Sequence, residues 1–177
     1  MAEQKLKGKK VAIIAADMVE QVELVEPRKA LEDAGAETTL ISLKPGKIQG
    51  FNHFDPADEL KVDKAIEETD AGDYDALMIP GGVGNPDQLR GDENIVSFVR
   101  DFFEAGVVRD RKLTSWPTLQ TDIRNAGGNW VDEQVVVDQG LVTSRKPDDI
   151  PAFNKKMIEE FCEGKHAEQR SKTRAAT

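Results

Sequence analysis

Apolar residues along the chain fall either in continuous runs or in stripes at helical spacing. Residues 9–17 form a near-continuous apolar run behind a basic start, and residues 73–82 form a second run that ends in one proline and two glycines. Runs of this kind are typical of parallel strands covered on both faces. They predict two buried strands, and residues 36–42 predict another strand after the first helix.

Four segments carry apolar residues at helical spacing: residues 20–35, 92–106, 117–128 and 147–164. In the first helix, Leu24 and Leu31 lie seven positions apart, and Pro27 is expected in its first turn or at a bend. In the other helices, the residues expected to face inward are Ile95, Val99, Phe102, Leu119, Ile123, Ile150, Phe153, Met157 and Phe161.

The remaining segments read as turns and short strands. Residues 44–50 predict a turn and an excursion at the sheet edge, residues 58–74 a short strand, a helical turn and a loop, and residues 129–145 a strand and a hairpin. Alternating strands and helices predict an α/β fold with a parallel sheet between helix layers. We expect a polar extension over residues 1–8, a single domain over 9–164 and a disordered tail over 165–177.

Composition narrows the classes of function. The chain has 177 residues and a formal net charge of −9, which disfavours binding to nucleic acid or to an anionic membrane surface. Its single cysteine can form no internal disulfide, and no cluster has zinc spacing, so we expect a cytoplasmic protein without metal or cofactor. The first apolar run is too short to span a membrane.

Candidate chemistry lies where predicted strands end, because ligands of open α/β sheets bind at the carboxyl ends of the strands. Glu20 and Glu23 follow the first strand, where they could act in catalysis or only complement the dipole of the next helix. Gly81 and Gly82 follow the strand over 73–82 in "PGGVGNP". Their N–H groups could hold an oxyanion or a phosphate, or the segment could be an ordinary turn.

Four blocks together resemble the PfpI family of intracellular proteases, within the superfamily of class I glutamine amidotransferase-like domains. They are "VAIIAADMVEQVELVEPRKALEDAGAE", "DYDALMIPGGVGNPDQLR", "RKLTSWPTLQTDIRNAGGNWVDEQVVVD" and "GLVTSRKPDDIPAF". The resemblance implies a flavodoxin-like three-layer sandwich with a mostly parallel sheet, assembled as a homodimer or higher homo-oligomer and linked to stress protection. Members are described as proteases, glyoxalases, deglycases and holdase chaperones.

The resemblance also assigns site residues. The family's nucleophile is a cysteine at a tight turn between a strand and a helix, followed by histidine, glycine and proline. Glu20 matches the family's catalytic glutamate, and Gly81 and Gly82 match the turn that helps to form the oxyanion site. The nucleophile segment, about sixteen residues or one strand and a short helix, is missing between Gly106 and Val107. We therefore expect the sheet to lack or repack one interior strand and one helix.

No other residue is expected to replace the nucleophile. Cys162 reads as an ordinary thiol on the last helix. His53 reads as a solvated or locally bonded loop side chain that could reach a pocket or a subunit interface. Ser115 is expected to cap the helix that opens at Pro117.

The sequence leaves several functions open. The chain could be an inactive descendant of a cysteine hydrolase, a chaperone-like protein, or a residual enzyme that acts on small aldehydes or acyl groups through Glu20. A flavodoxin-like module that binds a phosphate ligand at "PGGVGNP" is a further alternative. A deletion between two copies of Glu-Ala-Gly would explain the junction at "EAGVV", whether the deletion is natural or engineered.

Overall fold

The computed structural model describes residues 4–102 and 108–163. The chain divides into two compact units, residues 1–102 and 103–177, and each is described here by itself. The prediction of one domain over 9–164 stays a prediction. Gly106 and Val107, at the expected junction, and the expected tail over 165–177 lie outside the described residues.

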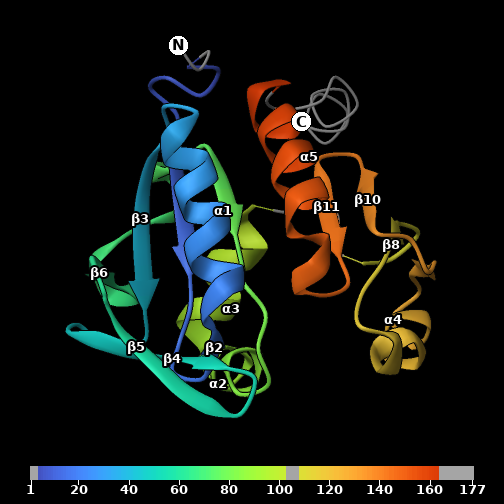
Figure 1. Cartoon of the computed structure of the whole chain (residues 1–177), viewed down its shortest axis with the longest axis horizontal. Coiled ribbons are helices and arrows are strands. Elements are labelled where there is room, and N and C mark those ends of the chain that lie inside the picture. Colours follow the sequence, from blue (N-terminus) through green and yellow to red (C-terminus); the bar gives the residue numbers. More distant parts are fainter. Residues whose placement is uncertain (1–3, 103–107, 164–177) are drawn as a thin grey trace, which may run out of the picture. The chain divides into compact units, whose positions relative to one another are not determined.

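The first unit contains the parallel sheet that the sequence predicts (Figure 1). Its elements are β1 (Lys10–Ile14), β2 (Val19–Glu20), α1 (Gln21–Asp33), β3 (Glu37–Ser42), β4 (Lys47–Asn52), β5 (Asp55–Lys61), β6 (Lys64–Ala65), β7 (Ala76–Met78), α2 (Asn85–Arg90) and α3 (Glu93–Asp101), with single 3-10 turns at Ile66–Glu68 and Ala71–Asp73.

Strand β1 lies inside a four-stranded sheet of order β6-β3-β1-β7. It pairs in parallel with β3, where Ile13 lies opposite Leu40, and with β7, where Ile13 lies opposite Met78. Every residue of β1 after Lys10 is fully buried, as the continuous apolar run predicts.

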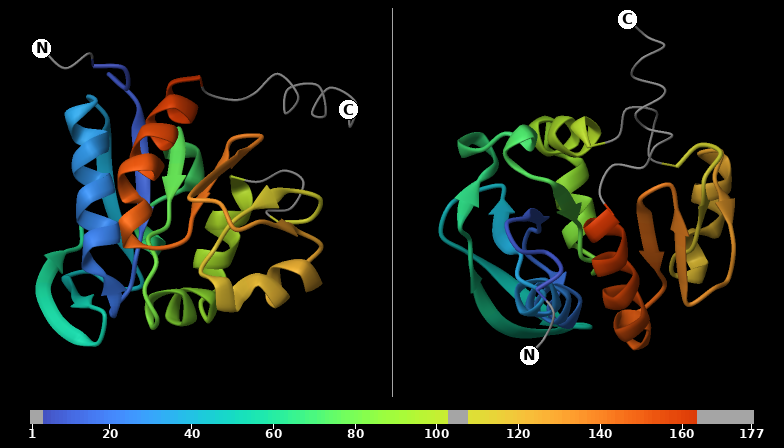
Figure 2. Two further views of the ribbon diagram at one scale, coloured as in Figure 1. Left: turned by 45° about the vertical axis from the view of Figure 1, so that its right-hand side comes forward. Right: turned by 90° about the horizontal axis from the view of Figure 1, so that it is seen from above.

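Helices cover both faces of this sheet. Ala12 and Ile14 belong to a cluster with Ile95 and Phe98 of α3. Because side chains alternate along a strand, Val11 and Ile13 point to the opposite face, where α1 lies (Figure 2). Burial on both faces gives the three layers of an α/β sandwich.

A smaller sheet lies next to the end of β1. Strands β4 and β5 form the antiparallel hairpin that corresponds to the predicted edge excursion, and β2 pairs in parallel with β4. In that pairing Glu20 lies opposite Phe51, so the hairpin is held directly against the residue that begins α1.

The helices follow the predictions in part. Pro27 is the seventh residue of α1 and lies beyond its first turn, where the missing N–H leaves the carbonyl of Glu23 without its intrahelical partner. The other predicted outcome, a bend at Pro27, stays a prediction. Helix α2 was not predicted. The predicted helix over 92–106 is confirmed as α3 at Glu93–Asp101, and the Asp92 carboxylate caps it by accepting from the N–H groups of Asn94 and Ile95.

The second unit contains two small sheets and two helices. Its elements are β8 (Lys112–Leu113), α4 (Gln120–Asn125), β9 (Asn129–Trp130), β10 (Val135–Asp138), β11 (Leu141–Ser144) and α5 (Ile150–Glu163), with 3-10 turns at Pro117–Leu119 and Pro147–Asp149. The predicted hairpin is confirmed as β10 and β11, and its turn places Gln139 and Gly140 at φ of 48° and 84°.

Two local predictions for this unit are wrong. Leu119 is 48% exposed rather than inward-facing. Ser115 does not cap the turn at Pro117, because Trp116 holds the cap position and no side chain caps it. The Ser115 hydroxyl instead donates to the Trp116 carbonyl and accepts from Nε1 of Trp130.

Strand β7 is an edge strand among the described residues, where its one pairing partner is β1. Strand β8, which follows the expected deletion, pairs in parallel with β9. No helix in the described ranges 4–102 and 108–163 is long and apolar enough to cross a membrane.

Candidate functional site

The end of β1 and the loop after β7 meet at the start of α1. Glu20 holds the N-cap position of α1, and its N–H donates to the Gly81 carbonyl at 3.3 Å. Glu20, Gly81 and Gly82, which the sequence assigns to one site, are therefore brought together. The three residues come from segments 60 positions apart, and all lie at the carboxyl end of the parallel sheet.

The Glu20 side chain is directed to the hairpin instead of capping its own helix. Only 10% of the side chain is exposed, and Oε2 accepts from the His53 N–H at 3.1 Å. The His53 ring is 73% exposed, with Nδ1 at 3.7 Å from the same oxygen. The exposed ring agrees with the solvated loop side chain that the sequence suggested, whereas the hydrogen bond to Glu20 is made by the His53 backbone.

Glu23 lies one helical turn further along α1 and belongs to the same site. Its Oε2 accepts from the Gly81 N–H at 2.9 Å. Burial raises the pKa of Glu23 above its usual value, the Gly81 hydrogen bond opposes that rise, and the charge of Glu20 adds to it. Two carboxyls with different surroundings are suited to divide the roles of acid and base. Because the Gly81 N–H already donates to Glu23, it is not free to hold an oxyanion in this structure.

Gly82 permits the close approach of the loop to Glu20. It has φ of 111°, a conformation that side chains with a Cβ rarely adopt. A Cβ at this position would lie 2.6 Å from the Met18 carbonyl oxygen and 2.7 Å from the Glu20 nitrogen. The second glycine of "PGG" is therefore required by the structure whatever its chemical role.

Asn85, which sequence reasoning missed, fixes the loop to β1. It is fully buried, and its Oδ1 accepts from the Ala16 N–H at 2.7 Å while Nδ2 donates to the carbonyls of Pro80 and Gly81 at 2.7 and 3.2 Å. Gln88 adds a bond from Nε2 to the Asp17 carbonyl at 2.8 Å. The sequence signal that could have found Asn85 is an asparagine directly after a glycine-rich turn, because its side chain can both accept and donate hydrogen bonds.

The other candidate nucleophiles lie in the second unit. Cys162 is exposed and lies in the last turn of α5, among Glu159, Glu160 and Glu163. Activated thiolates instead lie near helix N-termini or cationic groups. No group of three or more metal-ligating side chains occurs in the part of the chain that the structure describes.

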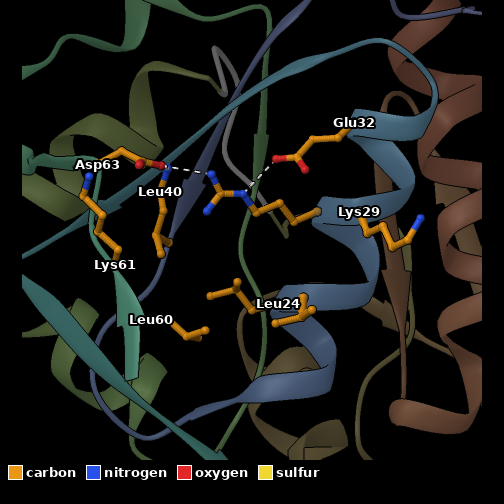
Figure 3. Close-up of a pocket in the computed structure, with 9 residues that line it drawn as sticks. Leu24, Lys29, Glu32, Leu40, Leu60, Lys61 and Asp63 are labelled. Carbon is orange, nitrogen blue, oxygen red and sulfur yellow. Dashed lines mark hydrogen bonds and ion pairs between the residues drawn. The ribbon is translucent and has the colours of Figure 1, made fainter. Parts of the chain in front are cut away.

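A hollow of about 320 Å³ lies away from Glu20, between α1, β3 and β5. Leu24, Leu40 and Leu60 form its apolar floor, and Glu32 and Asp63 lie on opposite sides (Figure 3). Arg28 crosses this space, donating from Nε to Glu32 at 3.0 Å and from Nη2 to Asp63 at 3.1 Å. Its guanidinium is therefore engaged in holding α1 to the sheet.

Comparison with known proteins identifies the fold and the family. The model of the "DJ-1/PfpI family" matches residues 9–108 and 103–160. The chain belongs to the DJ-1/PfpI family. Solved DJ-1/PfpI structures share the fold. The chain superposes on Drosophila melanogaster DJ-1beta with a TM-score of 0.77 at 23% identity, covering 87% of this chain and 90% of that one.

Several DJ-1/PfpI relatives align over nearly their whole length. General stress protein 18 of Bacillus subtilis is 39% identical over 170 positions, covering 85% of this chain and 96% of the relative. Protein/nucleic acid deglycase 2 of Escherichia coli is 37% identical over 169 positions, covering 85% and 96%. A two-domain protein from Anabaena variabilis with DJ-1/PfpI-like and ferritin-like domains gives a TM-score of 0.79 at 30% identity, with 85% of this chain on 47% of that one.

Two properties of these matches concern the junction. The two segments matched by the DJ-1/PfpI model overlap at residues 103–108. The alignments with General stress protein 18 and with deglycase 2 span 170 and 169 positions. They cover 85% of the 177 residues of this chain, which is about 150 residues. In each alignment, about 20 positions of the relative therefore have no counterpart in this chain.

Proposed function

We propose that this chain is a catalytically inactive DJ-1/PfpI protein that keeps the acidic half of the family's site and lacks the nucleophile. The observation that carries the proposal is the position of the one cysteine of the chain. Cys162 lies in the last turn of α5, whereas the nucleophile of the resembled family lies at a tight strand-to-helix turn.

The comparisons support a missing segment at the expected place. A family model that matches as two segments overlapping at residues 103–108 is what an internal deletion between two similar short sequences would leave. The unmatched alignment positions, about 20, are enough for one strand and a short helix.

The remaining groups can bind a ligand, but they supply no thiolate. Glu20, Glu23 and the Gly82 N–H can hold a carbonyl compound and move a proton, but none of them forms the covalent intermediate for which a thiolate is needed. We therefore infer a binding or chaperone-like role in stress protection. The relatives are named as a stress protein and a deglycase.

Turnover of methylglyoxal tests the proposal. We expect no turnover above background from the unmodified chain, from Glu20→Ala or from Cys162→Ser. As a positive control, the segment of General stress protein 18 that aligns with the gap is inserted between Gly106 and Val107. Activity of the unmodified chain that is lost in Glu20→Ala or in Cys162→Ser would overturn the proposal.

A residual enzyme is the second candidate, and the raised pKa of Glu23 favours it. A carboxyl whose pKa is raised by burial is better suited than an ordinary one to donate a proton to a small aldehyde. This candidate predicts turnover that survives Cys162→Ser but is lost in Glu20→Gln. A phosphate ligand at residues 80–86 has less support, because Glu23 would repel an anion there. Calorimetry with nucleotides and flavins tests it.

Assembly and location are also proposals. We propose a homodimer or higher homo-oligomer in the cytoplasm, with no nucleic-acid or membrane partner, from the family resemblance and the charge of −9. Sedimentation equilibrium measures the assembly, and a monomer at all concentrations would contradict it.

A further inference from the structure

Strand β7 has an outer edge that is ready to pair with another strand. The Asp75 N–H donates to the Lys10 carbonyl at 2.8 Å, so this residue faces β1. Because backbone groups alternate sides along a strand, Leu77 also faces β1, whereas the N–H and C=O groups of Ala76 and Met78 point away from it. No described strand pairs with those outward groups.

The two edges of this sheet differ in how they are protected. Edge strands commonly carry a charge or a proline that prevents pairing with another chain. The opposite edge strand, β6, is two residues long and carries Lys64. Strand β7 is Ala-Leu-Met, with no charge or proline inside it, and Ile79 just beyond it is 46% exposed. The β7 edge therefore has the features of a strand that is normally covered.

The direction of the chain indicates what would cover it. After β7 the chain runs through α2 and α3, and a strand that follows such a crossover most often pairs next to the strand before it. Since β1 occupies one side of β7, that strand would add to the outer side, parallel to β7. The relatives carry about 20 further positions in these alignments, and the family match places the interruption at 103–108.

We propose that the outer edge of β7 is a docking site for a strand supplied by another polypeptide, and that its occupant is the segment that relatives carry at this gap. The bound strand lies parallel to β7 and pairs with the backbone groups of Ala76 and Met78. This inference rests on the proposed function, in which the nucleophile segment is missing. It is tested by peptide binding, without a measurement of activity.

The probe is a synthetic peptide with the sequence of General stress protein 18 that aligns with the gap, titrated into the full chain by calorimetry. We expect saturable one-to-one binding, with a scrambled peptide at least about tenfold weaker, because its side chains no longer match the sheet faces. Equal binding of the two peptides, or no binding of either, would overturn the docking site.

Backbone methylation gives a control that leaves the protein unchanged. Two versions of the peptide carry N-methyl groups at alternate positions of the predicted strand, one set at odd and one at even positions. A strand on β7 uses one set of N–H groups, so one version should lose about five- to tenfold in affinity and the other should not. Equal effects of both sets would contradict strand pairing.

On the protein side, Ala76→Pro removes an outward N–H that makes no bond within the sheet. We expect it to weaken peptide binding about five- to tenfold while the far-ultraviolet circular dichroism stays unchanged. If the chain instead forms a dimer that Ala76→Pro dissociates and the peptide does not displace, a second copy occupies the edge and this proposal is wrong. Methylglyoxal turnover by the chain alone would overturn the proposed function. If the chain is inactive and the peptide does not bind, only this inference is overturned.

Discussion

The Glu23 carboxylate accepts a hydrogen bond from the Gly81 N–H at 2.9 Å, across 58 positions of sequence. This bond ties the first turn of α1 to the loop that follows β7. It also removes one of the two glycine amides that the sequence assigned to an oxyanion site. The relationship makes Glu23 as important to the site's properties as Glu20.

Glu23→Gln should stabilise the first unit at neutral pH. Burial raises the pKa of Glu23 in the folded state. The protonated carboxyl therefore adds to the free energy of unfolding below the ordinary pKa of 4.5, and this contribution is lost as the pH rises through the raised pKa. A neutral amide keeps an acceptor for Gly81 and removes repulsion with Glu20. We expect a gain of up to about 1 kcal/mol at pH 7 that vanishes near pH 4.

Urea unfolding followed by circular dichroism at both pH values measures this difference. Glu26→Gln, an exposed position on the same helix, is the matched control. A Glu23→Gln variant that is less stable than wild type at pH 7, or a gain that does not depend on pH, would contradict the assignment.

Gly82→Ala should be more destabilising than Gly46→Ala. Both glycines have φ near 111°, but a Cβ at Gly46 has no atom within 4 Å, whereas one at Gly82 meets the backbone of Met18 and Glu20. The strain of the backbone conformation is therefore common to both, at about 1 to 3 kcal/mol. We expect Gly82→Ala to cost at least about 1 to 2 kcal/mol more, measured as the difference in thermal midpoint converted to free energy. Equal losses of stability in Gly82→Ala and Gly46→Ala would show that the loop at Gly82 can shift away from Met18 and Glu20 at no cost.

Asn85→Ala should loosen the loop between β7 and α2. The change leaves the buried Ala16 N–H and the Pro80 carbonyl without partners, which costs about 2 to 4 kcal/mol. Asn85→Asp keeps the acceptor for the Ala16 N–H but replaces the donor by a buried charge that faces two carbonyls. We therefore expect it to destabilise the protein at least as much as Asn85→Ala does. Hydrogen exchange at Ala16 reports the lost bond directly. Unchanged protection there in both variants would mean that the side chain does not hold the loop.

Asp149→Asn should destabilise the second unit. Burial alone would raise the pKa of Asp149, but hydrogen bonds and charge from Arg145, with Nε at 3.0 Å, lower it overall. The ionised carboxylate therefore adds to the free energy of unfolding above the ordinary pKa of 3.8. This contribution is lost as the pH falls through the lowered pKa of the folded state. Because the Asp149 side chain is only 3% exposed, we expect a loss of about 2 to 4 kcal/mol at pH 7 that shrinks in acid.

Tryptophan fluorescence measures this loss selectively, because Trp116 and Trp130, the two tryptophans of the chain, both lie in the second unit. Asp148→Asn is the control, since the Asp148 side chain is 81% exposed and pairs only with Lys146 among the ion pairs described. Equal effects of the two substitutions would rule out a special role for the buried carboxylate.

The sequence predicted the elements whose burial pattern is simple. The run over residues 9–17 became β1, which is buried after Lys10, and the stripe through Ile95 became α3. It failed where local patterns admit two outcomes. Leu119 has the spacing of an inward residue, but it ends the 3-10 turn at Pro117–Leu119, just before the short helix α4, and its side chain is exposed. Ser115 is a residue type that often caps helices, but Trp116 holds the cap position and the Ser115 hydroxyl accepts from the Trp130 indole N–H instead.

Three members of the candidate site were predictable from the sequence, but Asn85 and the bonds of the site were not. The positions of Glu20 and the two glycines at strand ends were enough to place them together. The partners of Gly81 and Asn85 depend on contacts between segments some 60 residues apart, which no local pattern specifies.

Asn85 makes its bonds to Ala16, Pro80 and Gly81, and Glu20 makes its own to Gly81 and His53, so these hydrogen bonds all lie within the first unit. A deletion after residue 102 removes none of them. If the nucleophile segment is missing as proposed, its loss leaves these bonds in place, so a chain of this family can keep the local shape of the loop after β7 without the family's nucleophile.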